Sequence, residues 1–155
     1  MNAGTALRSA RDTVFRATGL NALARRRLDA GRAALLMYPR ALPQSEAERL
    51  AVEPAMFVPP ESFDDQLRAL REYGFQPTPL HTLCQHSEDS RPWPRRAVAL
   101  TFDDGWRDNH SHAGPIVERH GFTATVFVVT ERVGTAGAFW PDEVARRLAA
   151  LGHDE

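Results

Sequence analysis

Two adjacent carboxylates are the residues of this sequence whose type and position best suit chemistry. Asp103 and Asp104 follow the apolar run Ala97–Phe102, which predicts a buried strand, and precede Gly105. Carboxylates this close repel each other, so one is protonated or a cation lies beside them. With a divalent metal, one carboxylate can be a ligand while the other acts as general base for a metal-bound water. That pairing suits hydrolysis.

The same three residues also fit a reading without chemistry. Asp-Asp-Gly is a common composition for a polar turn between a strand and a helix, with Asp104 or Asp108 as the helix cap. Spacing alone leaves both readings open. The elements around the turn are therefore needed to position it.

The segments before the carboxylates predict one strand, one long loop and one clear helix. The apolar run 32–38 predicts a strand that stops at Pro39, and the Pro-punctuated stretch 39–60 predicts a loop. Residues 62–73 predict a helix with a capping box of Ser62 and Asp65, and Gly74 closes it. A short strand at 75–80, a helical turn at 80–86 and a polar connector at 87–96 are expected next.

The segments after the carboxylates repeat the alternation of helix and strand. Residues 108–120 predict a helix closed by Gly121, and the run 124–129 predicts a strand covered on both faces. A last helix is expected from Pro141. This order indicates an α/β protein with a parallel sheet and helical crossovers. Asp103 and Asp104 then lie at the carboxyl edge, where both can turn toward one pocket.

The domain expected from this pattern is incomplete. Residues 1–30 predict a helical lead-in of two short helices, 5–17 and 21–30, and residues 31–155 predict the first half of a larger α/β domain. A parallel barrel usually takes about 250 residues, whereas only about four strands are visible. We therefore expect an N-terminal fragment.

Composition excludes some partners and leaves others open. The net charge of −1 argues against nucleic acid, and all 19 basic residues are arginine, eight of them within residues 1–40. No run approaches the ~20 apolar residues of a membrane span, and no secretion signal is recognisable, so a cytoplasmic or membrane-peripheral protein is expected. Cys84 is the single cysteine and is expected to be a small core residue rather than a reactive thiol.

The stretch AVALTFDDGWRDNHSHAGPIVERHGFTATVFVVTERVG resembles the first motif block of the polysaccharide deacetylase family, the NodB-homology domain of carbohydrate esterase family four. The apolar strand that ends in Met37-Tyr38 and the Phe63-Asp64-Asp65-Gln66-Leu67 helix also agree. The resemblance covers roughly residues 33–155. It implies a distorted (β/α) barrel and the removal of N-acetyl groups from an acetylated amino-sugar polysaccharide.

The resemblance also implies roles for individual residues. Asp103 matches the catalytic base and Asp104 matches a ligand of the divalent metal, commonly zinc. The family's remaining metal ligands are two histidines that follow a Gly-His-Glu stretch, which Gly152-His153-Asp154 resembles, so those ligands are expected beyond Glu155. Many relatives have a histidine where this chain has Pro39, which implies reduced or altered activity.

The other aromatic and imidazole side chains are weaker candidates. Trp106 is expected either to wall a sugar-binding pocket or only to close its base. His110 and His112 diverge on a helix and are expected to be surface or packing residues. Trp140 is expected to be a core anchor or staple.

These observations favour a metal-dependent polysaccharide deacetylase, a hydrolase of carbon–nitrogen bonds other than peptide bonds, represented here by a fragment that is inactive alone. The alternative is a non-catalytic carbohydrate-binding or partner-binding module on a degenerate deacetylase barrel. A catalytic zinc site ordinarily uses three protein ligands, and the resemblance matches only one here. The sequence does not indicate an oligomeric state.

Overall fold

The computed structural model of this chain describes residues 32–135, 139–140, 143–144 and 147–148. The two lead-in helices predicted for 5–17 and 21–30 lie outside these residues, and so does most of the last predicted helix. Within the described part, no helix is long and apolar enough to cross a membrane.

In the part of the chain that the structure describes, four parallel strands form the sheet, as the sequence predicts. They are β1 (Ala34–Tyr38), β2 (Gln76–Pro77), β3 (Ala97–Phe102) and β4 (Ala124–Val126). Strand β1 pairs with the whole of β3, from Ala34 opposite Val98 to Tyr38 opposite Phe102. On the other edge of β3, β2 pairs with its first residues and β4 with its last. The predicted parallel α/β fold is confirmed.

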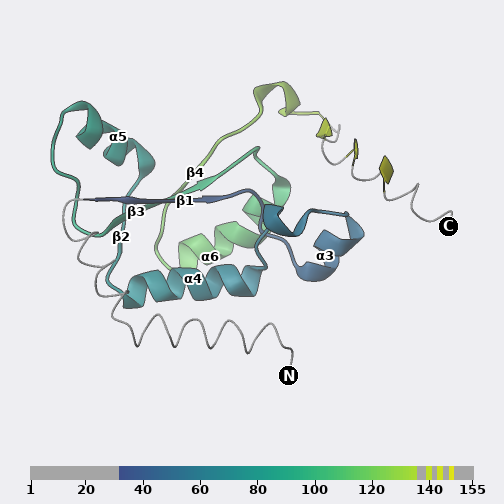
Figure 1. The fold of residues 1–155 in the computed structure, drawn as a ribbon, viewed down its shortest axis with the longest axis horizontal. Helices are drawn as coiled ribbons and strands as arrows, with labels where there is room; N and C mark the ends of the chain where they lie inside the picture. Colours follow the sequence, from purple (N-terminus) through teal and green to yellow (C-terminus); the bar gives the residue numbers. More distant parts are fainter. Residues whose placement is uncertain (1–31, 136–138, 141–142, 145–146, 149–155) are drawn as a thin grey trace.

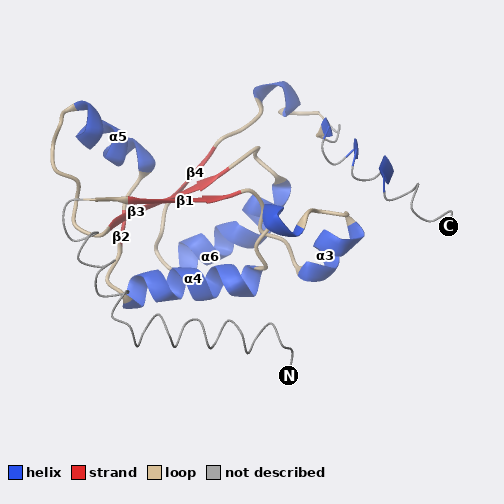
Figure 2. Ribbon diagram, in the orientation of Figure 1, coloured by secondary structure: helices blue, strands red, loops and turns tan. Residues whose placement is uncertain are grey.

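Helices cover the two faces of the sheet unequally (Figure 1, Figure 2). Helices α4 (Pro60–Glu72) and α6 (Gly114–Arg119) lie along one face, and α5 (Leu80–Glu88) lies on the other. The larger core forms between the sheet and α4 and α6, because Phe63 and Leu67 of α4 and Ile116 and Val117 of α6 pack on its apolar side chains.

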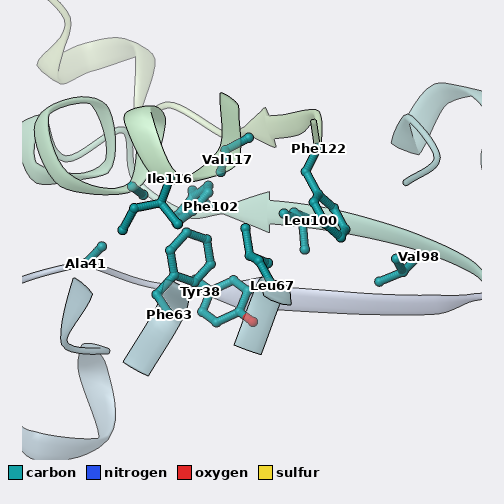
Figure 3. Packing of buried hydrophobic residues seen from close by; sticks show 11 residues of the cluster. Tyr38, Ala41, Phe63, Leu67, Val98, Leu100, Phe102, Ile116, Val117 and Phe122 are labelled. Carbon is teal, nitrogen blue, oxygen red and sulfur yellow. The ribbon is translucent and has the colours of Figure 1, made fainter. Parts of the chain in front are cut away.

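The centre of this core is a group of three aromatic rings (Figure 3). Phe63 packs edge-on against Tyr38, with ring centroids 4.8 Å apart, and against Phe102 at 5.8 Å. The three rings come from α4, β1 and β3. They hold the carboxyl ends of the paired strands β1 and β3 together, next to the turn that carries the carboxylates.

Burial of Tyr38 predicts a loss of stability at high pH. Burial raises the pKa of its phenol to about 12, and the hydroxyl donates a hydrogen bond of 2.8 Å to Gln66 Oε1. A tyrosine in the unfolded chain titrates near 10, so the stabilisation is complete below pH 10 and is lost as the pH rises towards 12. We expect the free energy of unfolding to fall by roughly 2 kcal/mol over this window.

Chemical denaturation at several pH values between 9 and 12 measures this effect. Tyr38→Phe is the control, because its unfolding free energy should change less with pH in that window. Parallel curves for the two proteins would show that Tyr38 does not contribute.

Four details of the predicted elements are wrong. Residues 39–60 form helix α3 (Gln44–Arg49) and a 3-10 turn (Pro54–Met56) rather than an irregular loop. An isolated bridge between Ala41 and Val58 brings the two ends of this segment together, which makes it compact. Helix α4 begins at Pro60 after Pro59, and no side chain caps it, so the Ser62–Asp65 capping box does not form. Cys84 is exposed rather than in the core, because Leu83 faces the sheet instead.

The fourth error concerns the strand after α6. Strand β4 spans only Ala124–Val126, and the side chains of Val126, Phe127 and Val128 are about half exposed. Among the described residues β4 pairs only with β3, so it is an edge strand, and its exposed side chains show that it is not covered on both faces.

Candidate active site

A pocket lies at the carboxyl edge of the sheet, where the segments that follow β1, β3 and β4 meet. Its volume is about 440 Å³. The segment after β1 contributes Pro39, Arg40, Ala51, Val52, Glu53 and Met56; the turn after β3 contributes Asp104 and Trp106; the segment after β4 contributes Val129, Glu131, Arg132, Phe139 and Trp140. Carboxyl edges of parallel sheets are where ligands bind in such folds, so this pocket is the candidate active site.

The turn that carries the two carboxylates has a conformation that few residues adopt. The Asp103 N–H donates to Tyr38 O at 3.3 Å and so continues the β1–β3 ladder by one residue. Asp104 then has a φ of 65° and Gly105 a φ of 73°, both in the left-handed region. Aspartate tolerates this region better than most residues and glycine tolerates it freely. The sequence Asp-Asp-Gly therefore permits a sharp turn directly after the strand.

The turn gives the two carboxylates different environments. Asp104 is exposed and lines the pocket and a smaller adjoining hollow of about 200 Å³. Asp103 is half-buried and is not among the residues that line either cavity. Of the two side chains expected to face one pocket, only Asp104 does so in this structure. No hydrogen bond or ion pair joins either carboxylate to another described side chain.

These residues do not by themselves make a complete metal site. Within the described part of the chain, no group of three histidine, cysteine or acidic side chains is placed to hold an ion. Catalytic zinc sites ordinarily use three protein ligands. The turn can supply carboxylate oxygens to a cation, and any further ligands have to come from elsewhere.

Trp106 lines the pocket and is contacted by Arg40 and Phe139. Its ring lies 4.0 Å from the guanidinium carbon of Arg40 and 4.4 Å, between centroids, from the ring of Phe139. Trp106 therefore presents a fixed, partly exposed aromatic surface to the pocket. Of the two expected roles for this residue, the position agrees with the wall of a binding pocket.

The sequence does not reveal the residues that hold this wall in place. Asp108 is buried and accepts two hydrogen bonds from Arg40, from Nε at 3.0 Å and from Nη2 at 2.7 Å. Sequence alone suggests only a helix-capping role for Asp108, yet it caps no helix N–H. Its partner Arg40 lies 68 residues away in the sequence. The sequence signal for this contact is therefore limited to two adjacent polar residues, Asp108 and Asn109, in a predicted amphipathic helix.

Trp140 corrects another expectation. The sequence predicts a core anchor or staple, but 73% of the Trp140 surface is exposed and the residue lines the pocket. Phe139, its neighbour, contacts Trp106 instead. The apolar pair Phe139-Trp140 therefore faces the candidate site and not the core.

No histidine in the described part of the chain lines the pocket. His110 is exposed, and His112 Nε2 is 3.8 Å from Glu46 Oε1. Both lie in a π-helical segment (Asn109–Ala113) that interrupts the predicted helix. His120 Nε2 is 2.8 Å from Asp64 Oδ1 and so joins α6 to α4. The hydrogen bonds of Arg119 and then His120 lower the pKa of Asp64 below its ordinary value.

Gly105 is expected to tolerate no side chain. A Cβ at this position would lie 2.8 Å from Val128 Cγ1, in a backbone conformation that already disfavours side chains. We expect Gly105→Ala to lower the free energy of unfolding by about 1–3 kcal/mol and to displace the turn.

Gly134→Ala provides the matched control for this prediction. Gly134 has nearly the same φ, 75°, and a Cβ added there would have no atom within 4 Å. In Gly134→Ala the new side chain is disfavoured by the backbone conformation but makes no close contact. We therefore expect denaturant unfolding to show a smaller loss of unfolding free energy than for Gly105→Ala. Equal losses for the two variants would mean that Val128 exerts no constraint.

Comparisons with known proteins agree on one family. Residues 90–154 match the family model for polysaccharide deacetylase. The chain is 32% identical over 78 residues to YxkH of Bacillus subtilis and 33% identical over 99 residues to the poly-beta-1,6-N-acetyl-D-glucosamine N-deacetylase of Escherichia coli K12. It also superposes on the Streptococcus pyogenes deacetylase PplD, solved in complex with acetate, with a TM-score of 0.59 and 26% identity.

Over residues 90–154 the chain is similar to the polysaccharide deacetylase family, and these relatives and PplD point to the same family. The matches cover 50% of this chain and 28% of YxkH, 64% of this chain and 14% of the Escherichia coli enzyme, and 69% of this chain and 47% of PplD. The chain thus spans less than half the length of each of these relatives. The incomplete α/β barrel agrees with the similarity to PplD.

Proposed function

We propose that this chain forms part of a metal-dependent hydrolase that removes N-acetyl groups from an amino-sugar polysaccharide. The observation that carries the proposal is the placement of Asp103 and Asp104 at the carboxyl end of β3, beside a pocket with an aromatic wall. The similarity to an enzyme named as a poly-beta-1,6-N-acetyl-D-glucosamine N-deacetylase supports this substrate class.

The proposed roles follow the chemistry of each residue. Asp104 faces the pocket and supplies carboxylate oxygen to a divalent cation, with Zn²⁺ as the proposed ion. When bound, such an ion polarises a carbonyl group and so makes it more easily attacked. Asp103, one residue earlier, accepts the proton of the attacking water. Trp106 packs against a sugar ring, because aromatic faces bind the apolar faces of sugars.

We further propose that the 155 residues alone are inactive. The described residues offer fewer than the three ligands of an ordinary catalytic zinc site, and the chain covers only a minor part of the relatives' lengths. Pro39, which lines the pocket where many relatives carry a histidine, removes one polar group from the site.

Acetate release from an acetylated β-1,6-linked glucosamine oligomer, measured in the presence of Zn²⁺, tests the proposal. We expect none from the 155-residue chain and release from the longest gene product that contains it. In that product Asp103→Asn should lower the rate by about 10²–10⁴-fold. Asp89→Asn is the control, because Asp89 is an exposed carboxylate that pairs with Arg91.

Two outcomes would contradict parts of this account. Acetate release from the 155-residue chain would refute the proposal that it is inactive alone. Binding of the oligomer without any release by the longer product, with or without Zn²⁺, would favour the alternative of a non-catalytic carbohydrate-binding module.

A further inference from the structure

Two consecutive polar residues join the segment after β1 to the turn after β3. Asp108 and Asn109 follow Trp106 by two and three residues and are both buried. Their side chains contact Pro39, Arg40 and Ala41 from the first segment. These three residues lie at the edge of the pocket or directly behind it, so the contacts bear on the shape of the site.

Asp108 fixes the aromatic wall through Arg40. Both oxygens of its carboxylate are used: Oδ2 accepts from the Arg40 guanidinium, and Oδ1 accepts from the Ala41 N–H at 3.3 Å. The guanidinium in turn lies over the ring of Trp106. Rotation of Arg40 away from Asp108 would remove the cation–π contact, so the ring position depends on the carboxylate.

Asn109 fixes the turn itself. Its Nδ2 donates to Pro39 O at 3.2 Å and makes a longer contact of 3.5 Å with Asp103 O. The amide nitrogen must face these two carbonyl oxygens, because the amide oxygen would be repelled by them. The side chain therefore spans the ends of β1 and β3, next to the proposed base.

The placement of Asn109 has two unusual features that packing alone would not require. Its Oδ1 is buried and has no hydrogen-bond partner within the described part of the chain. The helix also has π geometry over Asn109–Ala113, before α6 begins at Gly114. An unsatisfied buried acceptor is unfavourable, and π-helical turns occur frequently at functional sites. Both features are consistent with a side chain whose placement is set by the site.

We propose that Asp108 and Asn109 are positioning residues that fix the turn Asp103–Gly105 relative to the pocket wall formed by Arg40 and Trp106. The expected effect on oligomer binding rests on the proposed function. The positions of the turn and of Trp106 can be measured without a ligand. Neither residue faces the pocket, so neither is a catalytic residue.

Asn109→Ala and Asp108→Asn in the 155-residue chain test the proposal. Asn109→Ala should raise the hydrogen-exchange rate of the Asp103 amide at least about tenfold, because the turn loses its tie to Pro39. Asp108→Asn retains an acceptor for Ala41 but loses the charge that holds Arg40, so the Trp106 indole resonance should shift. Each variant should bind an acetylated β-1,6-glucosamine oligomer at least about tenfold more weakly in NMR titrations.

Leu70→Ala is the matched control, because Leu70 of α4 packs against the core away from the pocket. It should lower stability and leave oligomer affinity and the Trp106 resonance unchanged. If Asn109→Ala does not fold, Asn109→Ser provides a smaller change at the same site. Variants of Asp108 and Asn109 that lose stability as Leu70→Ala does, with unchanged affinity and unchanged local readouts, would overturn the proposal.

The two proposals fail in different ways. A longer gene product that releases no acetate would count against the proposed function. The Asp103 exchange rate and the Trp106 resonance would still decide whether Asp108 and Asn109 position the site.

Discussion

Arg40→Met is expected to lower the free energy of unfolding by about 3–5 kcal/mol, because it leaves the Asp108 carboxylate buried without its cation. The two side chains are 9% and 8% exposed and meet at 2.7 Å. At this depth little water can replace the lost guanidinium. Of the described hydrogen bonds to this carboxylate, the one from the Ala41 N–H then remains.

A double-mutant cycle with Asp108→Leu separates the coupling energy of the ion pair from the individual contributions of Arg40 and Asp108. The double variant Arg40→Met, Asp108→Leu buries no charge, so it should recover much of the stability that Arg40→Met loses. Denaturant unfolding measures all four proteins. Additive losses would mean that the ion pair contributes no coupling and that Arg40 acts through its other contacts.

Phe63→Ala should lower the free energy of unfolding by as much as Arg40→Met, for a different reason. Phe63 is fully buried and contacts the rings of Tyr38 and Phe102. Truncation leaves a cavity at the point where α4 meets the carboxyl ends of β1 and β3. Such a change in a core costs about 3–5 kcal/mol of unfolding free energy.

Phe127→Ala is the matched control for this prediction. The same atoms are removed, but the Phe127 side chain is 52% exposed. We expect its loss of unfolding free energy to be well under half of that for Phe63→Ala. Equal losses would indicate that the core around Phe63 collapses to fill the cavity.

The features predicted correctly from the sequence are those set by local pattern. The run Ala97–Phe102 has no polar interruption before Thr101, and it forms a strand in which every residue is buried. The spacing of Phe63, Leu67 and Leu70 on one helix face likewise matches the observed core. Gly105 after two aspartates predicts the turn, because few other residues adopt its backbone angles.

The features that were missed depend on contacts between distant parts of the chain. The Arg40–Asp108 pair joins residues 68 positions apart, and no periodicity marks it. The apolar run that contains β4 resembles that of β3, yet β4 has one strand partner among the described residues and is largely exposed. Trp140 and Cys84 were misplaced for the same reason, since residue type alone does not decide what covers a side chain.

The central claim is that Asp104, at the carboxyl edge of the sheet, binds a divalent cation beside the proposed base. Titration of the ¹⁵N-labelled chain with Mn²⁺ tests it directly, because the ion broadens the amide resonances nearest to it. The account predicts broadening centred on Asp103–Trp106 in the wild type and its loss in Asp104→Asn, with Gly121 unaffected in both. Broadening centred elsewhere, or equal broadening at the turn in Asp104→Asn, would contradict it.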